Sequence, residues 1–225
     1  MPYFYQASGG AAVDCQVVDS GKLLAKGFEI GLVSECSDVI SRSDTESAMK
    51  MSSIFASAEA WALHAGNGND SDASAHSARL GRVLIAGRNS DGKPAIEQDT
   101  LPYRALADLA QAGELPPILR KLRASSTSPT DSVMKAAEFH QAMRNACTNR
   151  CIFVIASGQL GLGPPTMGKH DVICILYGCQ WPVVLRRSGR EYAIVGVSYV
   201  EDMMYGEAIK EHKLMRRESY QFCIA

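Results

Sequence analysis

The hydrophobic pattern of this chain changes character twice, and that change most constrains its fold. Residues 1–43 and 150–225 contain short apolar runs with the character of strands, whereas residues 44–149 repeat apolar side chains at helical spacing. Alternation with a period of two indicates a half-buried strand, and steps of three and four residues indicate an amphipathic helix. We therefore predict an α+β fold in a single domain over residues 1–225. A small curled β-sheet or barrel is formed by N- and C-terminal strands, with a helical insertion between them.

The N-terminal region has the pattern of a β-hairpin. Residues 13–18 form a short run with high strand propensity, and residues 19–22 (Asp-Ser-Gly-Lys) supply turn chemistry. Residues 23–33 follow, where Phe28, Ile30 and Leu32 alternate with Glu29 and Gly31. The two runs predict a pair of neighbouring strands.

The middle of the chain predicts helices. Residues 44–47 (Asp-Thr-Glu-Ser) are typical of a helix start, and apolar residues then recur at three- and four-residue steps as far as Trp61 and Ala62. We expect a first helix over 44–64 and a polar surface loop over 65–77. Residues 79–86 fit either a helix or a strand, and we favour a helix. Further helices are expected at 100–111, 114–122 and 129–148.

The C-terminal region predicts strands again. Five short apolar runs are bounded by glycine or proline: 151–156, 171–176, 182–186, 191–200 and 219–224. Strands at this spacing are typical of a small barrel or a curled sheet.

Charge and cysteine usage exclude several classes of protein. The chain has 23 Lys plus Arg against 24 Asp plus Glu, so it has no excess positive charge to attract nucleic acid. No apolar run is long enough for a membrane helix, and the N-terminus lacks a signal-peptide pattern. Seven cysteines without a Cys-x-x-Cys pair argue against a disulfide framework or a zinc site. We expect a cytoplasmic protein with no bound metal, and Cys174 as a small core hydrophobe.

No cofactor motif is found in the sequence. The glycine-rich stretch 158–165 lacks Gly-Lys-Ser or Gly-Lys-Thr, and Pro164 and Pro165 remove backbone donors where a phosphate would bind. Ser157 lacks the Gly-x-Ser-x-Gly context of a hydrolase nucleophile. We therefore expect a turn at 158–165 and no cofactor.

A series of motifs in residues 150–208 carries a family resemblance. The series runs Gly158-Gln-Leu-Gly-Leu-Gly-Pro164, then Asp171 before an apolar strand, then Pro182-Val-Val-Leu-Arg186, and finally Tyr199-Val200 followed by Gly206-Glu-Ala208. It resembles the C-terminal region of fungal heterokaryon-incompatibility (HET) proteins. Full-length members of that family carry an N-terminal HET effector domain, which resembles TIR domains. This chain starts where that domain would have ended, so we expect a stand-alone domain that does not by itself deliver the family's death signal.

Departures from the family pattern direct attention to particular residues. Glu201-Asp202 replaces His-Gly, His170 replaces a glycine, and Tyr205 replaces an acidic residue. Two carboxylates in place of His-Gly can supply acid–base chemistry if one is desolvated. The alternative for this pair is a solvated loop.

We predict five candidate catalytic residues and four candidate substrate-binding residues. Carboxylates, a guanidinium and a phenol can together exchange protons and polarise a carbonyl. The catalytic set is Asp171, Arg186, Tyr199, Glu201 and Asp202, and the binding set is His170, Trp181, Met203 and Tyr205. Each has a structural alternative: an Asp171–Arg186 pair that holds the barrel shut, packed aromatic and methionine side chains, and an exposed histidine.

Two hypotheses of function follow from the resemblance, and we favour the first slightly over the second. In the first, the domain acts on a hydrophobic small molecule in fungal secondary metabolism and directs a cofactor-independent cyclisation or isomerisation in an apolar pocket. In the second, it is a non-catalytic recognition or regulatory module, either a homo-oligomer or a partner of another HET-family protein. A packed barrel interior would favour the second hypothesis.

Overall fold

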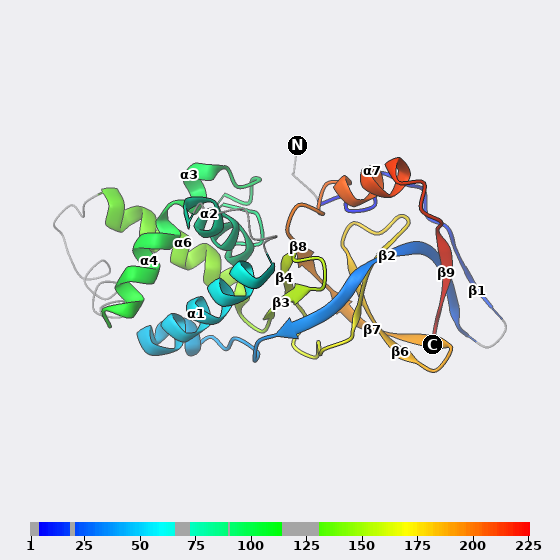
Figure 1. Ribbon diagram of the computed structural model, residues 1–225, viewed down its shortest axis with the longest axis horizontal. Coiled ribbons are helices and arrows are strands. Elements are labelled where there is room, and N and C mark those ends of the chain that lie inside the picture. Colours follow the sequence, from blue (N-terminus) through cyan, green and yellow to red (C-terminus); the bar gives the residue numbers. More distant parts are fainter. Residues whose placement is uncertain (1–4, 19–20, 66–72, 90, 114–130) are drawn as a thin grey trace. The chain divides into compact units, whose positions relative to one another are not determined.

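The computed structural model describes residues 5–18, 21–65, 73–89, 91–113 and 131–225 (Figure 1). The chain divides into two compact units. Met1–Cys36 and Phe153–Ala225 make up a β-rich unit, and Ser37–Ile152 make up a helical unit. The chain thus leaves the β-rich unit once, forms the helical unit and returns. The mixed α+β architecture with a helical insertion between N- and C-terminal strands is as predicted. Our interpretation of the chain as a single domain stays a prediction.

The β-rich unit is built on a closed ring of strands. β2 pairs with both β5 and β9, and β6 and β7 complete the path from β5 round to β9. Every neighbouring pair is antiparallel except β7 and β9, which are parallel and meet at Tyr192 and Ile224. The ring strands are β2 (Leu23–Cys36), β5 (Val172–Leu176), β6 (Val183–Ser188), β7 (Glu191–Val197) and β9 (Tyr220–Ile224).

Four shorter strands and one helix extend this unit beyond the ring. The C-terminal end of β2 continues the sheet through β3 (Cys151–Ile155), β4 (Leu160–Gly163) and β8 (Tyr199–Val200), and the N-terminal half of β2 pairs with β1 (Cys15–Val17) (Figure 1). The helix α7 (Glu207–Leu214) connects β8 to β9. The sheet is therefore a ring with extensions and not a simple barrel.

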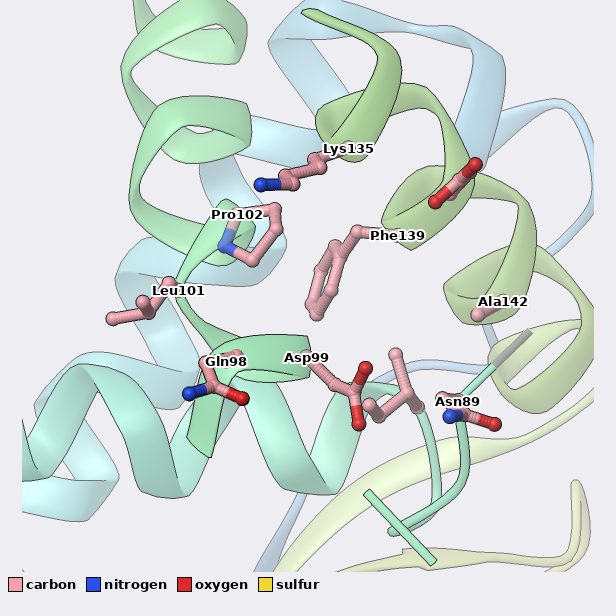
Figure 2. A pocket seen from close by; sticks show the side chains of 10 residues that line it. Asn89, Gln98, Asp99, Leu101, Pro102, Lys135, Phe139 and Ala142 are labelled. Atoms are coloured by element: carbon pink, nitrogen blue, oxygen red, sulfur yellow. The ribbon is translucent and has the colours of Figure 1, made fainter. Parts of the chain in front are cut away.

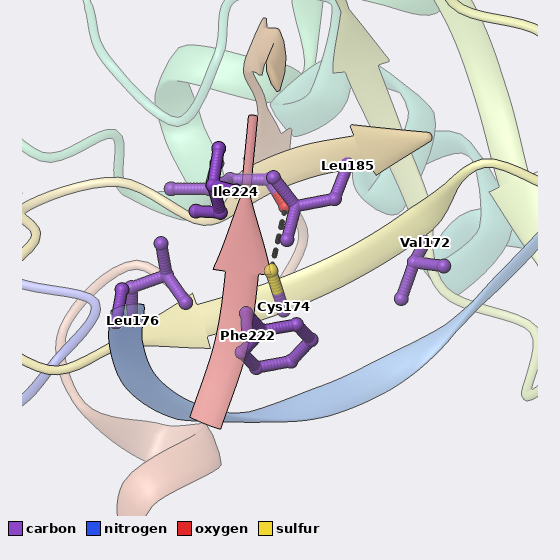
Figure 3. Packing of buried hydrophobic residues seen from close by; sticks show 8 residues of the cluster. Val172, Cys174, Leu176, Leu185, Phe222 and Ile224 are labelled. Atoms are coloured by element: carbon purple, nitrogen blue, oxygen red, sulfur yellow. Dashed lines mark hydrogen bonds between the residues drawn. The ribbon is translucent and has the colours of Figure 1, made fainter. Parts of the chain in front are cut away.

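Side chains fill the interior of the ring. Alternate residues of each strand face inward, as the pleat requires, and they form one buried cluster (Figure 3). The Phe222 ring is fully buried, and the Cys174 thiol donates a hydrogen bond to the Val183 carbonyl oxygen at 3.3 Å. Cys174 is therefore a core residue, as predicted. The cluster consists of Ala25, Val172, Cys174, Leu176, Val183, Leu185, Phe222 and Ile224.

Irregularities in β2 allow one long strand to serve several partners. Its register shifts between Glu29 and Gly31 opposite β5, and again between Val33 and Glu35 opposite β3. Such bulges bend a strand and increase its twist. Gly27 lies at a close approach, because a Cβ atom there would be 2.1 Å from the Ile175 carbonyl oxygen. A glycine is required at this position for β2 and β5 to meet.

The helical unit packs its helices around an aromatic core. Tyr103 lies between Phe55 and Phe139, with ring centroids 5.3 and 6.3 Å away, and all three side chains are buried. The Tyr103 hydroxyl donates a hydrogen bond to Glu59 at 2.8 Å, and burial raises its pKa. The elements are the 3₁₀ turn η1 (Asp44–Glu46) and helices α1 (Ala48–Ala65), α2 (Ala73–Leu84), α3 (Glu97–Thr100), α4 (Pro102–Gln111) and α6 (Asp131–Cys147).

Several element boundaries differ from the sequence-based expectation. β4 occupies residues 160–163, where we expected only a turn, and the run 191–200 is divided at Ser198 into β7 and β8. The helix α7 was not predicted. The helix expected at 114–122 lies outside the described residues. None of the helices in the described part of the chain combines the length and hydropathy needed to span a bilayer.

Candidate functional site

Asp171 and Arg186 form a two-point ion pair beside the ring. Val172 of β5 is paired with Leu185 of β6, so continuation of that register places Asp171 directly opposite Arg186. The Arg186 Nε donates to Asp171 Oδ1 and its Nη2 donates to Oδ2, both at 2.8 Å. The structure thus brings together two of the predicted catalytic residues.

Further hydrogen bonds satisfy both members of this pair. The backbone N–H of Gly168 donates to Asp171 Oδ2 at 2.8 Å, and Arg186 Nη2 also donates to the Thr166 carbonyl oxygen at 2.8 Å. Asp171 is 2% exposed, whereas the Arg186 side chain is 50% exposed. Hydrogen bonding and the negative charge of Asp171 raise the pKa of Arg186. The geometry is that of a structural clasp that joins β5, β6 and the loop before β5.

The adjacent residues Glu201 and Asp202 lie in different environments. Glu201 is 1% exposed, and its backbone N–H donates to the Leu160 carbonyl oxygen at 2.9 Å. Asp202 has a φ of +57° and an exposed side chain. A left-handed backbone at Asp202 reverses the chain, so one carboxylate is buried and the next faces solvent. The two do not share one environment, as an acid–base pair within a single pocket would.

An aromatic cluster gathers three other predicted residues. The Tyr5 ring lies 4.4 Å from Trp181, 5.8 Å from Tyr205 and 6.3 Å from Tyr199, measured between ring centroids. Tyr5 and Tyr199 are buried, whereas Tyr205 is exposed at the edge of the cluster. The sequence analysis missed Tyr5, and no local signal marks it, because it comes from the opposite end of the chain. The contacts are those of a packed aromatic core.

The two remaining predicted binding residues have separate positions. Met203 is buried. His170 is exposed, has a φ of +69°, and donates its backbone N–H to the Val33 carbonyl oxygen at 2.9 Å. A left-handed φ and a backbone hydrogen bond are typical of a turn residue.

A second polar network, which the sequence analysis missed, surrounds His212. The imidazole is stacked on the Phe28 ring, with centroids 3.8 Å apart, and its Nε2 lies 3.1 Å from the Ser219 hydroxyl. That hydroxyl is also 2.5 Å from the Tyr177 hydroxyl. His212 Nδ1 is buried without a hydrogen-bond partner among the described residues. Burial, followed by the positive charge of Arg217, lowers the pKa of His212.

The helical unit contains a pocket of about 280 Å³ (Figure 2). The Phe139 ring points into its centre, Asp99 and Asn89 lie on one side, and Lys135 and Pro102 lie on the other. The Asp99 carboxylate is partly engaged, because its Oδ2 accepts the Ile96 backbone N–H at 2.8 Å. None of the nine residues predicted from the sequence lies among those that line this pocket.

The strand β1 presents an edge with outward-facing backbone groups. Asp14 accepts a hydrogen bond from the Lys26 N–H, and Val18 donates one to the Lys22 carbonyl, both at 2.9 Å. In an antiparallel pair the bonded residues alternate, so Cys15 and Val17 direct their N–H and C=O groups away from β2. Within the described part of the chain, these outward groups have no hydrogen-bond partner. Val13 is 68% exposed and Val17 is 74% exposed.

Comparison with known families finds a match to the C-terminal part of the chain. Residues 121–222 match the family model of the Het-6 beta-barrel domain. The resemblance to the C-terminal region of HET proteins is thereby confirmed. No curated protein matches the chain, and no solved structure matches it.

The Het-6 beta-barrel match covers only part of the ring. It takes in β3 to β8 and most of β9, but it leaves out β1 and β2. Because β2 pairs with both β5 and β9, the ring cannot close without residues that precede the match. Among the described residues, no group of three or more His, Cys, Asp or Glu side chains is placed to hold a metal ion.

Proposed function

We propose that this protein is a non-catalytic recognition module that binds an extended segment of another protein along β1. The observation that carries this proposal is the outward backbone groups at Cys15 and Val17. A strand edge of this kind binds a partner by adding one more strand to the sheet.

The side chains of this edge support the same proposal. Natural sheets protect their edges with lysine, proline or inward charges, which prevent pairing with other chains. The edge of β1 carries the exposed Val17 and Cys15 instead. Backbone hydrogen bonds would supply affinity, and contacts to Val17 would supply selectivity.

The ring supports recognition more than it supports catalysis. Its interior holds the buried cluster that includes Phe222, and a densely packed core has little room for a ligand. Asp171 and Arg186 bind each other and two backbone groups. Cyclisation or isomerisation of a hydrophobic molecule in fungal secondary metabolism is therefore the less supported hypothesis. It would need Glu201 to act from a buried position.

The family match favours a partner from the same biology. The match to the Het-6 beta-barrel domain supports a protein related to heterokaryon incompatibility as the partner. We place the proposed module in the cytoplasm. Seven free thiols support that placement, because a reducing compartment keeps cysteines unpaired.

Selection from a displayed library of linear peptides tests the proposal. We expect enriched peptides with alternating β-branched residues, and we expect Val17→Pro to abolish their binding. Proline at this position removes an outward N–H without removing a hydrogen bond of the β1–β2 pair. Val17→Thr keeps the N–H and the branched side chain and is the matched control. Peptides that bind the proline variant equally well, or the absence of any enriched peptide, would overturn the proposal.

A further inference from the structure

We infer that Ser219 is a phosphorylation site for a protein kinase that selects arginine ahead of its target residue, with ATP as the phosphate donor, and that the phosphate releases α7 from the ring. The inference goes beyond the proposed function and does not depend on it. It follows from the basic residues that precede Ser219, from their exposure, and from the contacts of the Ser219 hydroxyl.

The sequence before Ser219 has a charge pattern that a kinase can recognise. Arg216 and Arg217 lie three and two residues before Ser219, and no other serine or threonine of the chain has arginine at both of these positions. Kinases distinguish their substrates by the pattern of charges around the target hydroxyl. Carboxylates of a kinase can pair with each guanidinium through charge-assisted hydrogen bonds.

The connection between α7 and β9 presents this pattern to solvent. The helix ends at Leu214 and the strand begins at Tyr220, so residues 215–219 belong to neither element. Arg216 and Arg217 are both exposed. Opening this connection breaks no strand pair, because the pairing of β9 with β2 begins at Tyr220. Local opening of this limited kind lets a kinase bind the segment while the ring stays folded.

The Ser219 hydroxyl links α7 to the ring. Ser219 is half-buried, and its Oγ lies 3.1 Å from His212 Nε2 in α7 and 2.5 Å from the Tyr177 hydroxyl at the end of β5. His212 in turn stacks on Phe28 of β2. A phosphoryl group in place of the hydroxyl proton needs the space that these two contacts fill, and it adds nearly two negative charges. Phosphorylation therefore separates His212 from this network and loosens α7.

The chemical step needs ATP and the kinase but no further group from this chain. The Ser219 Oγ forms a bond to the γ-phosphorus of ATP while the bond from that phosphorus to the β–γ bridging oxygen breaks. ADP leaves, and the hydroxyl proton passes to the catalytic base of the kinase. This chain has only to present the hydroxyl and the two arginines.

Phosphorylation of the full chain in vitro tests the site. With the catalytic subunit of cyclic-AMP-dependent protein kinase, magnesium and ATP, we expect peptide mass spectrometry to locate phosphate at Ser219. Ser219→Ala should lose it. Ser188 is the internal control, because it is exposed and follows Arg186 and Arg187 but has leucine three residues before it. An unmodified Ser219, or equal modification of Ser188, overturns the inference.

Substitution of the basic residues tests the recognition. Arg216→Ala and Arg217→Ala should each lower the rate of phosphorylation at Ser219 about tenfold or more, because each removes a charge-assisted hydrogen bond. Lys213→Ala is the matched control, since it removes an exposed positive charge of α7 outside the pattern. If Lys213→Ala lowers the rate as much as the arginine variants do, the arginine pattern is not what the kinase reads.

Hydrogen exchange tests the effect of the phosphate. The phosphorylated chain should exchange its amide hydrogens in α7 faster than the unmodified chain, whereas β5 and β6 should keep their protection. Ser219→Ala removes the same hydrogen bonds without adding charge and should show a smaller change. Equal protection of α7 with and without phosphate would overturn the release of the helix. Binding of displayed peptides at β1 is a separate measurement, so either result leaves the proposed function to its own test.

Discussion

The ring and the helical unit differ in how far along the chain their contacts reach. In the ring, Leu23 pairs with Ile224 and Gly27 pairs with Leu176. In the helical unit, Phe55, Tyr103 and Phe139 come from one continuous stretch of chain. Closing a long loop costs chain entropy before any contact repays it, and contacts distant in sequence slow folding. The contacts that close the ring therefore join residues from both ends of the chain, whereas the contacts of this aromatic core join residues of one stretch.

The two regions also differ in how completely they fill their interiors. The ring is packed with small and medium apolar side chains around Phe222. The helical unit leaves a pocket of about 280 Å³ beside Phe139. A filled interior leaves its outer edges for binding, and an unfilled one can take a ligand within it.

The largest expected effect is the loss of stability when a buried aromatic ring is removed from one of the two cores. Phe222→Ala in the ring and Phe55→Ala in the helical unit each remove a buried aromatic ring, at a cost of about 3–5 kcal/mol. Hydrogen exchange read by mass spectrometry should show lost protection in β2, β5 and β9 for the first variant. The second should lose protection in α1 and α4. The exposed neighbour Gln221→Ala serves as the control. Equal loss of protection in both units from either variant would show that the units do not open independently.

The reactivity of buried thiols offers a second way to compare the ring with the helical unit. Cys174 in the ring and Cys147 in the helical unit each donate to a backbone carbonyl, and burial raises the pKa of Cys147 to about 12. Burial raises the pKa of Cys174 as well. Both should react with iodoacetamide about a hundredfold or more slowly than the exposed Cys15, because the thiolate is the reactive form.

Labelling at increasing urea concentration should show when each region opens. We expect Cys147 and Cys174 to become reactive at different urea concentrations, measured by peptide mass spectrometry. Simultaneous labelling would indicate a single cooperative unit.

A smaller effect is expected from the clasp beside the ring. Arg186→Met leaves the buried Asp171 carboxylate with Gly168 N–H as its remaining donor in this cluster, and should destabilise the ring by about 2 kcal/mol. The value is modest because the guanidinium is half exposed. Arg187→Met removes an exposed neighbour and should change the urea midpoint little. An unchanged midpoint for Arg186→Met would show that the ion pair does not hold β5 to β6.

The smallest expected effect depends on pH. Because the pKa of His212 is lowered in the folded protein, protonation favours the unfolded chain. Stability should be fully present above the ordinary pKa of histidine, about 6.5, and should fall as the pH drops below it. His212→Gln should flatten this acid dependence between about pH 6.5 and 5, measured by urea unfolding at each pH, whereas the exposed His170→Gln should not. If His212→Gln loses as much stability toward low pH as the unsubstituted chain does, other groups cause the pH dependence.

Much of the fold could be predicted because its signals are local. The alternation around Phe28 and Ile30 identified β2, and the glycine- and proline-bounded run 171–176 identified β5. The helix α7 was missed because it is only eight residues long and buries few side chains, among them Ile209 and His212. Periodicity is a weak signal over two turns.

The candidate site was harder to predict, because its geometry depends on distant contacts. The Asp171–Arg186 pair was foreseen as a structural alternative and is present. The different environments of Glu201 and Asp202 depend on a left-handed φ that an aspartate adopts without a local sequence signal. Tyr5 joins its cluster only when residues near opposite ends of the chain meet. The unpaired edge of β1 required the observed register and could not be read from composition.

The pairing of Leu23 with Ile224 also determines the order in which the protein can be completed during synthesis. The helical unit has been translated in full once residue 152 is made, so it can fold while the remainder of the chain is still on the ribosome. The ring cannot close until residue 224 has left the exit tunnel. Until then β2 lacks its neighbour β9.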